Sequence, residues 1–216
     1  GRLAAIITLG SHICQIDSRF AGRGWGHRMR IERYAPTWHK KVIDLAKEAF
    51  GEGYFSKPGE IAGDPDTIML VSNETDGSLL GLVQGRLLPE NALAEYLEHK
   101  VSDVPDEVAA ADRDGALGVI EIVAVAESQR GTGLGTRLIS SMHDALIGHG
   151  ADKLIVSFRH GPSASRVDGL MKKLGFEPWT RLPSYWQAEC DAGEFKCVDR
   201  TDHCTCEALL YRKSVY

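Results

Sequence analysis

Apolar residues along the chain recur with two different periods, and these periods predict where helices and strands lie. A three- to four-residue spacing links Trp38, Val42, Leu45 and Ala49 and predicts a helix that ends near Phe50. The same spacing predicts helices at 92–99, from 134 to between 148 and 150, and at 163–174. Short β-branched and apolar runs predict strands at 30–34, 67–72, 79–87, 118–126, 153–158, 176–186 and 205–213.

The order of these elements indicates one domain built around one sheet. Asp76-Gly77 predicts a hairpin between the second and third strands, and the nearly continuous apolar run at 118–126 is typical of a buried central strand. We therefore expect an α/β fold of the α+β type, with a single mixed, mostly antiparallel central sheet flanked by helices. An acidic, alanine-rich stretch interrupts the pattern at 89–117. It predicts an insertion, either beside the substrate site or as a solvated excursion.

The first 28 residues differ in charge from the rest of the chain. They carry four Arg and one Asp, a net charge of +3, so residues 29–216 carry −5 − 3 = −8. We expect residues 29–216 to form the domain. Residues 1–28 would be an extension that comes from upstream or cloning sequence, or an arm that packs on a partner subunit.

Composition narrows the class of protein. A hydrophobic content of 43% and a charged content of 25% over 216 residues are ordinary for a globular domain. No apolar run approaches the roughly 20 residues that span a bilayer, so we expect no membrane partner. The acidic excess argues against nucleic-acid binding and suits a cationic substrate.

The segment Arg130-Gly131-Thr132-Gly133-Leu134-Gly135 lies between the predicted central strand and the next helix. Glycines let a backbone approach a phosphate closely, and the N–H groups and dipole of a helix N terminus attract it. A P-loop would need Gly-Lys-Ser/Thr where this chain has Gly135-Thr136-Arg137, and the dinucleotide fingerprint lacks its third glycine. The segment therefore predicts phosphate binding of another type, unless the turn only packs a helix on a strand.

The segment matches Arg-x-x-Gly-x-Gly, and at this point the chain resembles the GNAT superfamily of N-acetyltransferases, whose acyl-CoA signature is Arg/Gln-x-x-Gly-x-Gly/Ala. The resemblance extends back to the strand 121–125 and forward to Lys173-Leu174-Gly175-Phe176. It is strong over about 118–176 and follows the element order over 29–216. It implies a GNAT-like sheet with a splayed strand pair at the acyl-CoA site, acetyl-CoA as co-substrate and, as in many family members, a homodimer.

The resemblance also implies roles for individual residues. Backbone N–H groups would bind the pyrophosphate at Arg130, Gly131, Thr132, Gly133, Leu134, Gly135 and Thr136. A backbone N–H of Val125 or its strand neighbour Val123 would bind the thioester oxygen. Ser163 or Ser165 would contact the pantetheine, in place of an Asn that the family has and this chain lacks.

Catalysis requires a group that removes a proton from the amine. Glu121 is the candidate base, because an acid in an apolar strand is costly unless it is hydrogen-bonded or functional. It could instead face solvent or pair with an Arg. The family's usual Tyr acid would fall at Met171, so the alternative acid is Tyr185, although such a Tyr is more often a half-buried strand residue.

Four cysteines and one histidine gather near the C-terminal end of the chain. Cys190, Cys197, Cys204 and Cys206 are candidate ligands of a structural zinc ion, with His203 beside them. The equal alternative is reduced thiols without metal. The odd total of five cysteines favours a reducing, cytoplasmic location over a disulfide scaffold.

Three functions fit these observations. The first is acetyl transfer from acetyl-CoA to an amine on a small cationic molecule, which the acidic charge of residues 29–216 favours. The second is acetylation of protein N termini or lysines. The third is a non-catalytic acyl-CoA-binding module, consistent with the absence of Tyr at 171.

Overall fold

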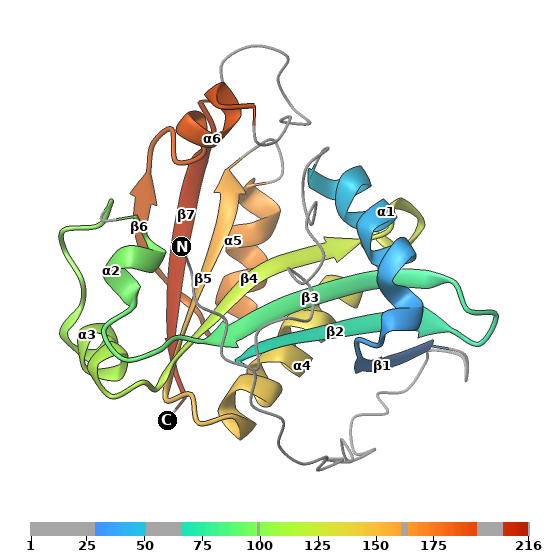
Figure 1. The fold of residues 1–216 in the computed structure, drawn as a ribbon, viewed down its shortest axis with the longest axis horizontal. Helices are drawn as coiled ribbons and strands as arrows, with labels where there is room; N and C mark the ends of the chain where they lie inside the picture. Colours follow the sequence, from blue (N-terminus) through green and yellow to red (C-terminus); the bar gives the residue numbers. More distant parts are fainter. Residues whose placement is uncertain (1–28, 51–65, 99, 161–163, 194–204, 216) are drawn as a thin grey trace.

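A computed structural model of the protein describes residues 29–50, 66–98, 100–160, 164–193 and 205–215. Within these residues the chain forms a seven-stranded sheet with helices on both faces (Figure 1). The strands are β1 (Met29–Arg33), β2 (Thr67–Glu74), β3 (Leu79–Leu87), β4 (Leu117–Val125), β5 (Lys153–His160), β6 (Glu177–Leu182) and β7 (Glu207–Ser214). The helices are α1 (His39–Phe50), α2 (Leu93–Tyr96), α3 (Asp106–Arg113), α4 (Leu134–Gly148), α5 (Ala164–Lys173) and α6 (Gln187–Asp191), with 3-10 turns at Pro36–Trp38 and Glu127–Gln129.

The sheet is mixed and mostly antiparallel, as the sequence predicts. Its strand order is β1-β2-β3-β4-β5-β7-β6, and β4 with β5 is the parallel pair. The other neighbours run antiparallel. The parallel pair lies near the middle of the sheet and joins an N-terminal group of strands to a C-terminal group.

The two parallel strands separate after four residue pairs. β4 pairs with β5 from Leu117 to Ile120, opposite Lys153 to Val156, and the pairing stops there. Beyond this point β4 stays paired with β3 as far as Val125, and β5 stays paired with β7 as far as His160. Figure 1 shows the two strands diverging, which confirms the expected splay.

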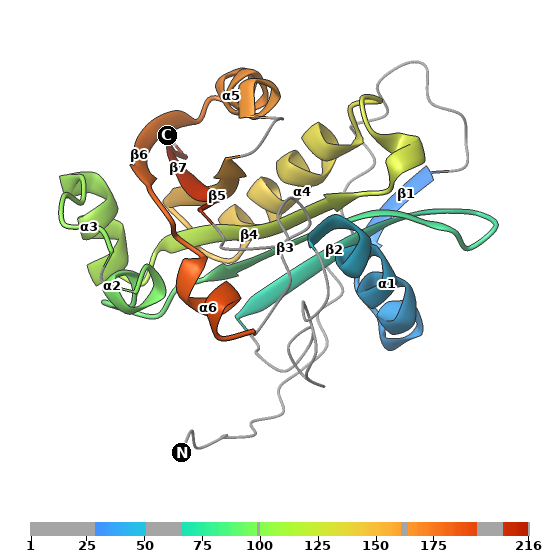
Figure 2. The same ribbon diagram turned by 90° about the horizontal axis from the view of Figure 1, so that it is seen from above.

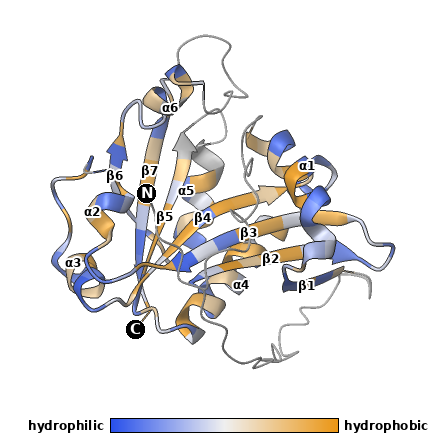
Figure 3. Cartoon of the chain, viewed as in Figure 1, coloured by the Kyte–Doolittle hydropathy of each residue, from blue (hydrophilic) through white to orange (hydrophobic). Residues whose placement is uncertain are grey.

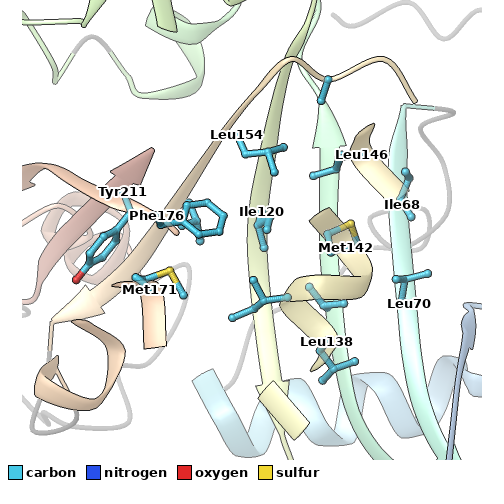
Figure 4. Packing of buried hydrophobic residues seen from close by; sticks show 14 of the residues in the cluster. Ile68, Leu70, Ile120, Leu138, Met142, Leu146, Leu154, Met171, Phe176 and Tyr211 are labelled. Atoms are coloured by element: carbon cyan, nitrogen blue, oxygen red, sulfur yellow. The ribbon is translucent and has the colours of Figure 1, made fainter. Parts of the chain in front are cut away.

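Helices α4 and α5 cover one face of the sheet, and α1 and α6 lie on the other (Figure 2). On the first face, Leu138 and Met142 of α4 pack in one cluster with Ile68, Leu70 and Ile120 of the strands (Figure 4). α4 can approach closely because β3 has a glycine there. A Cβ at Gly85 would lie 2.6 Å from the carbonyl oxygen of Val119 and 3.0 Å from Sδ of Met142.

Two further clusters cover the opposite face. One packs α1, through Val42 and Leu45, against β2, β3 and β4. The other packs α2 and α3, through Leu93 and Val108, against β4, β5 and β7. The hydropathy colouring follows this arrangement, with apolar residues along much of β4 and on the inner side of α4 (Figure 3).

The structure corrects two predictions and refines a third. The predicted strand 176–186 ends at Leu182, because the chain turns at Pro183 and Ser184 (φ 51°) and then forms α6. The acidic stretch contains an unpredicted helix, α3, whose signal is Pro105 followed by Asp106 and Glu107 in the first turn. The helix predicted at 92–99 is a single short turn, α2. The assignment of 89–117 as an insertion and of 29–216 as the domain stays a prediction, and residues 1–28 lie outside the described residues.

Among the described residues, no helix combines the length and the hydrophobicity that crossing a membrane requires.

Candidate active site

The glycine-rich segment forms the turn between β4 and α4. Gly131 and Gly133 have φ angles of 79° and 90°, a conformation that side chains other than glycine rarely adopt. Gly133 is the N-cap of α4, and no side chain caps this helix end. The first N–H groups of α4, from Leu134 to Thr136, are therefore left for another acceptor.

The side chains of this segment turn to the core or to neighbouring backbone, so its backbone N–H groups are what remains to bind a ligand. Leu134 is buried in the core beneath α4, and the hydroxyl of Thr132 donates to the carbonyl oxygen of Gln129 at 2.7 Å. A Cβ at Gly135 would point at Val125 and lie 3.7 Å from its Cγ2. Its absence keeps open the space between the first turn of α4 and the end of β4. Such a glycine-lined helix N terminus fits the pyrophosphate of an acyl-CoA.

Arg130 ties this turn to the end of β4. Its Nε donates to the carbonyl oxygen of Val125 at 3.2 Å, and its Nη2 lies 3.6 Å from Oε1 of Glu48 on α1. In this position the side chain braces the turn, while the backbone of residues 130–136 remains the candidate phosphate site.

Beyond Ile120, the backbone groups of β4 on the side away from β3 no longer pair with β5, although the carbonyl oxygen of Val125 accepts from Arg130. The N–H of Ala126 donates to Leu80, and Ala124 lies opposite Leu82 in the same register. In an antiparallel pair the hydrogen-bonded residues alternate, so the N–H and C=O of Val123 and Val125 point away from β3. We call this side, from Glu121 to Val125, the unpaired edge of β4. It carries the two residues predicted to bind the thioester end of the cofactor.

Glu121 occupies a β-bulge at the start of the unpaired edge. Gln84 lies opposite Ile122 and Gly85 lies opposite Ile120, so Glu121 is the extra residue on β4. Bulges commonly redirect a side chain beside an active site. This one places a carboxylate, 13% exposed, where β4 and β5 part.

Two side chains of β3 hold the carboxylate of Glu121. Nε2 of Gln84 donates to Oε2 at 3.0 Å, and Nε of Arg86 forms an ion pair with Oε1 at 2.8 Å. The structure thus shows the pairing with an Arg that the sequence left open. We call Gln84, Arg86 and Glu121 the carboxylate cluster. Sequence reasoning missed Gln84 and Arg86, although two polar residues at alternate positions of an apolar strand were a visible signal.

Oε1 of Gln84 is a buried polar atom of this cluster that has no hydrogen-bond partner among the described residues. Gln84 is 4% exposed, and no described residue donates a hydrogen bond to its Oε1. Oγ1 of Thr67, which lies opposite Arg86 on β2, is also buried and without a partner among the described residues. An unsatisfied buried acceptor typically costs about 1–3 kcal/mol, so such an atom requires an explanation.

The other residues that the sequence predicts for the site either pack elsewhere in the molecule or lie outside the described residues. Tyr185 packs at the edge of the α2–α3 cluster, where Nζ of Lys100 lies 4.3 Å from its ring centre and Trp186 packs edge-on. Met171, at the family's Tyr position, is fully buried beneath α5 (Figure 4). Ser165 lies in α5, but its side chain is outside the described part of the chain, as is the whole of Ser163.

The predicted zinc site is only partly within the described residues. Cys190 lies in α6 and Cys206 is buried just before β7, while Cys197, His203 and Cys204 lie outside the described ranges. Among the described residues, no group of three or more candidate ligands is close enough to bind a metal ion. Zinc binding stays a prediction.

A buried tyrosine fastens α5 to the sheet. The hydroxyl of Tyr211 on β7 donates to Oδ1 of Asp168 on α5, and its ring packs edge-on against Phe158. Burial, followed by the hydrogen bond and the negative charge of Asp168, raises the pKa of Tyr211 well above its ordinary value. This contact fixes the helix that flanks the splayed strands on the β5 side.

Comparisons with solved structures agree on the fold. An IAA acetyltransferase from Bacillus cereus superposes with a TM-score of 0.53 and 19% identity, over 87% of this chain and 99% of that one. The ribosomal-protein-S18-alanine N-acetyltransferase from Escherichia coli has a TM-score of 0.56 and 14% identity, over 87% and 94%. A Salmonella typhimurium protein described as an acetyltransferase, solved with its cofactor acetyl-CoA, has a TM-score of 0.54 and 15% identity, over 87% and 94%.

The sequence itself decides the family. No curated protein matches the chain. The family model described as the acetyltransferase (GNAT) family matches residues 27–176, which include the glycine-rich turn, the unpaired edge of β4 and the carboxylate cluster. The chain belongs to the GNAT family of acetyltransferases.

Proposed function

We propose that the protein transfers the acetyl group of acetyl-CoA directly to the amine of a small cationic molecule. One observation carries the proposal: the uncapped N terminus of α4 opens beside the unpaired edge of β4. The first feature suits a pyrophosphate, and the second suits the amide and thioester groups that continue from it. The family membership supports an acyl-CoA-dependent acyltransferase.

The cofactor would be held mainly by backbone groups. N–H groups between Arg130 and Thr136 bind the pyrophosphate, and those of Val123 and Val125 bind along the pantetheine and thioester. These donors are fixed before the ligand arrives, because β3 and α4 hold the backbone that carries them. The cofactor supplies an activated acetyl thioester.

Glu121 is the proposed base for the acceptor amine. Its carboxylate lies at the point where β4 leaves β5, and its oxygens keep lone pairs beyond those used by Gln84 and Arg86. It can therefore accept a proton from the amine directly or through one water molecule. For the leaving thiolate, Tyr185 stays a proposed acid, and a coenzyme A thiolate can also leave without one.

A small cationic acceptor is supported by charge. Residues 29–216 carry a formal charge of −8, since the chain carries −5 and residues 1–28 carry +3. An acidic surface attracts polyamine-like molecules over distances of about a Debye length. We also propose a cytoplasmic location, which is supported by the odd number of five cysteines in the chain.

The test starts with binding and continues with turnover. Acetyl-CoA is titrated into the protein by calorimetry, and release of coenzyme A is then followed with spermidine, an aminoglycoside, and peptides with a free N terminus or an internal lysine. Binding with turnover of spermidine or the aminoglycoside supports the proposal. Turnover of peptides alone would indicate that the acceptor is a protein N terminus or lysine. Binding without any turnover supports an acyl-CoA-binding module, and absence of binding contradicts the cofactor site.

A further inference from the structure

We propose that the side-chain oxygen of Gln84 binds the acceptor amine, beside the carboxylate of Glu121 and on the sheet face opposite α4. The inference rests on the proposed acetyl transfer and adds the residue that receives the acceptor. The observation behind it is the buried Oε1 of Gln84, to which no residue in the described part of the chain donates a hydrogen bond.

The strand pattern places the cluster on the face opposite α4. Gln84 and Arg86 flank Gly85, and a Cβ at Gly85 would meet Met142 of α4. Side chains alternate between the two faces of a strand, so Gln84 and Arg86 both point away from α4. The cofactor turn leads into α4, which covers the other face. The acetyl group and the acceptor would therefore meet from opposite faces, at the start of the unpaired edge.

Hydrogen-bonding chemistry fixes which way the Gln84 amide points. An ionised carboxylate only accepts hydrogen bonds, so Glu121 must face the NH₂ group of Gln84, as the 3.0 Å contact from Nε2 shows. Oε1 then points elsewhere. It can only accept, and no described residue donates to it. A ligand that reaches this oxygen must bring an N–H or O–H donor.

An amine meets this requirement at the right place. Its nitrogen carries several N–H donors. One can bond to Oε1 of Gln84 and another to the carboxylate of Glu121, because the Gln84 amide that carries Oε1 also contacts this carboxylate through Nε2. Arg86 has a different task. Its guanidinium pairs with Oε1 of Glu121 and holds the carboxylate against β3, so Arg86 is a positioning residue.

A second buried amide offers a matched comparison. Asn73 on β2 is 6% exposed, and its Nδ2 donates to Oε1 of Glu32 at 2.9 Å. Glu32 also accepts from Nε1 of Trp38, so this pair ties β1 to β2 and to the start of α1. Both amides donate to a carboxylate, but only that of Gln84 lies next to the bulge where β4 and β5 part.

The experiment compares Gln84→Met with Asn73→Leu, since each replaces a buried amide by an apolar side chain of similar shape. For Gln84→Met we expect the KM for the amine that the wild type acetylates to rise at least 10-fold. The Kd for acetyl-CoA should stay within twofold. The melting temperature should fall by less than in Asn73→Leu, because the lost hydrogen bond to Glu121 is offset by removal of the unsatisfied Oε1. For Asn73→Leu we expect a lower melting temperature and an unchanged KM for the amine.

The outcomes separate this inference from the proposed function. An unchanged KM in Gln84→Met, with the wild type active, would overturn the role of Gln84 and leave acetyl transfer standing. A lower melting temperature with equal loss of acetyl-CoA binding would assign Gln84 a structural role and also overturn the inference. No turnover of any amine by the wild type would overturn the proposed function and this inference with it.

Discussion

The two halves of β4 have similar sequences and different surroundings. Leu117 to Ile120 is bonded to β3 on one side and to β5 on the other, and its residues are buried. Glu121 to Val125 keeps β3 but not β5, and every second residue is partly exposed. The first half holds the two groups of strands together, and the second presents backbone donors and a carboxylate. One half of β4 thus stabilises the sheet, and the other half carries the groups proposed to bind the cofactor and the acceptor.

This difference arises from the neighbouring strand and the bulge. β5 turns away with β7 after Val156, and the extra residue at Glu121 shifts the register against β3. Variants of either half, or of the turn above the open half, should therefore change different properties.

Blocking the turn above the unpaired edge should have the largest effect on cofactor binding. Gly133→Glu should abolish measurable binding of acetyl-CoA, at least a 100-fold loss. At a φ of 90° a side chain is strained, and a carboxylate would repel the pyrophosphate. Calorimetric titration measures the loss. Gly148→Glu, which adds the same charge at the other end of α4, should bind normally, and full binding by Gly133→Glu would contradict the site.

Truncation of a core side chain tests whether the paired half of β4 contributes more to stability than the open half. Ile120→Ala should lower the free energy of unfolding by about 2–5 kcal/mol, because Ile120 is fully buried against α4 (Figure 4). Val125→Ala in the open half should cost about 1 kcal/mol, since its side chain is only partly buried. Urea denaturation compares the two. Equal losses would show that the halves do not differ in their contribution to stability.

Removal of the charge at the bulge separates chemistry from binding. Glu121→Gln should reduce kcat about 100-fold, as expected when a general base is lost, while the Kd for acetyl-CoA stays unchanged. Steady-state kinetics and calorimetry measure these two quantities. Glu32→Gln is the control, because Glu32 also accepts from a buried strand amide but lies at the sheet edge. A wild-type kcat in Glu121→Gln would remove this carboxylate from the mechanism.

The smallest expected effect is on the pH dependence of stability. It concerns Tyr211 on β7, which pairs with β5. The pKa of Tyr211 is raised by burial and by Asp168, whereas an unfolded Tyr titrates near about 10. The folded state therefore holds this proton more tightly, so the stabilisation is complete below pH 10 and is lost as pH rises above it. Tyr211→Phe should lose about 1 kcal/mol at pH 7 and decline less steeply between pH 10 and 11. Parallel declines in urea denaturation would contradict this assignment.

The features that the sequence predicts correctly are those encoded by a short contiguous stretch of residues. The turn at 130–135 is contiguous, and its glycines have a direct conformational meaning, so the family and the proposed position of the phosphate site both follow from it. The carboxylate cluster depends on the register between β3 and β4 and on a bulge, which no single stretch of sequence encodes. The sequence predicts Tyr185 on a strand, whereas β6 ends at Leu182 and Pro183 and Ser184 start the turn to α6.

The four-residue ladder between β4 and β5 has a consequence for amide exchange with solvent deuterium. Protection should be high from Leu117 to Ile120 and then alternate along β4, with Ala124 slow and its neighbours Val123 and Val125 fast. A ligand that lies along this edge would act as a missing strand and slow the two valine amides together. The exchange rates of the amides along β4 would thus report whether a ligand is bound between β4 and β5, without any measurement of turnover.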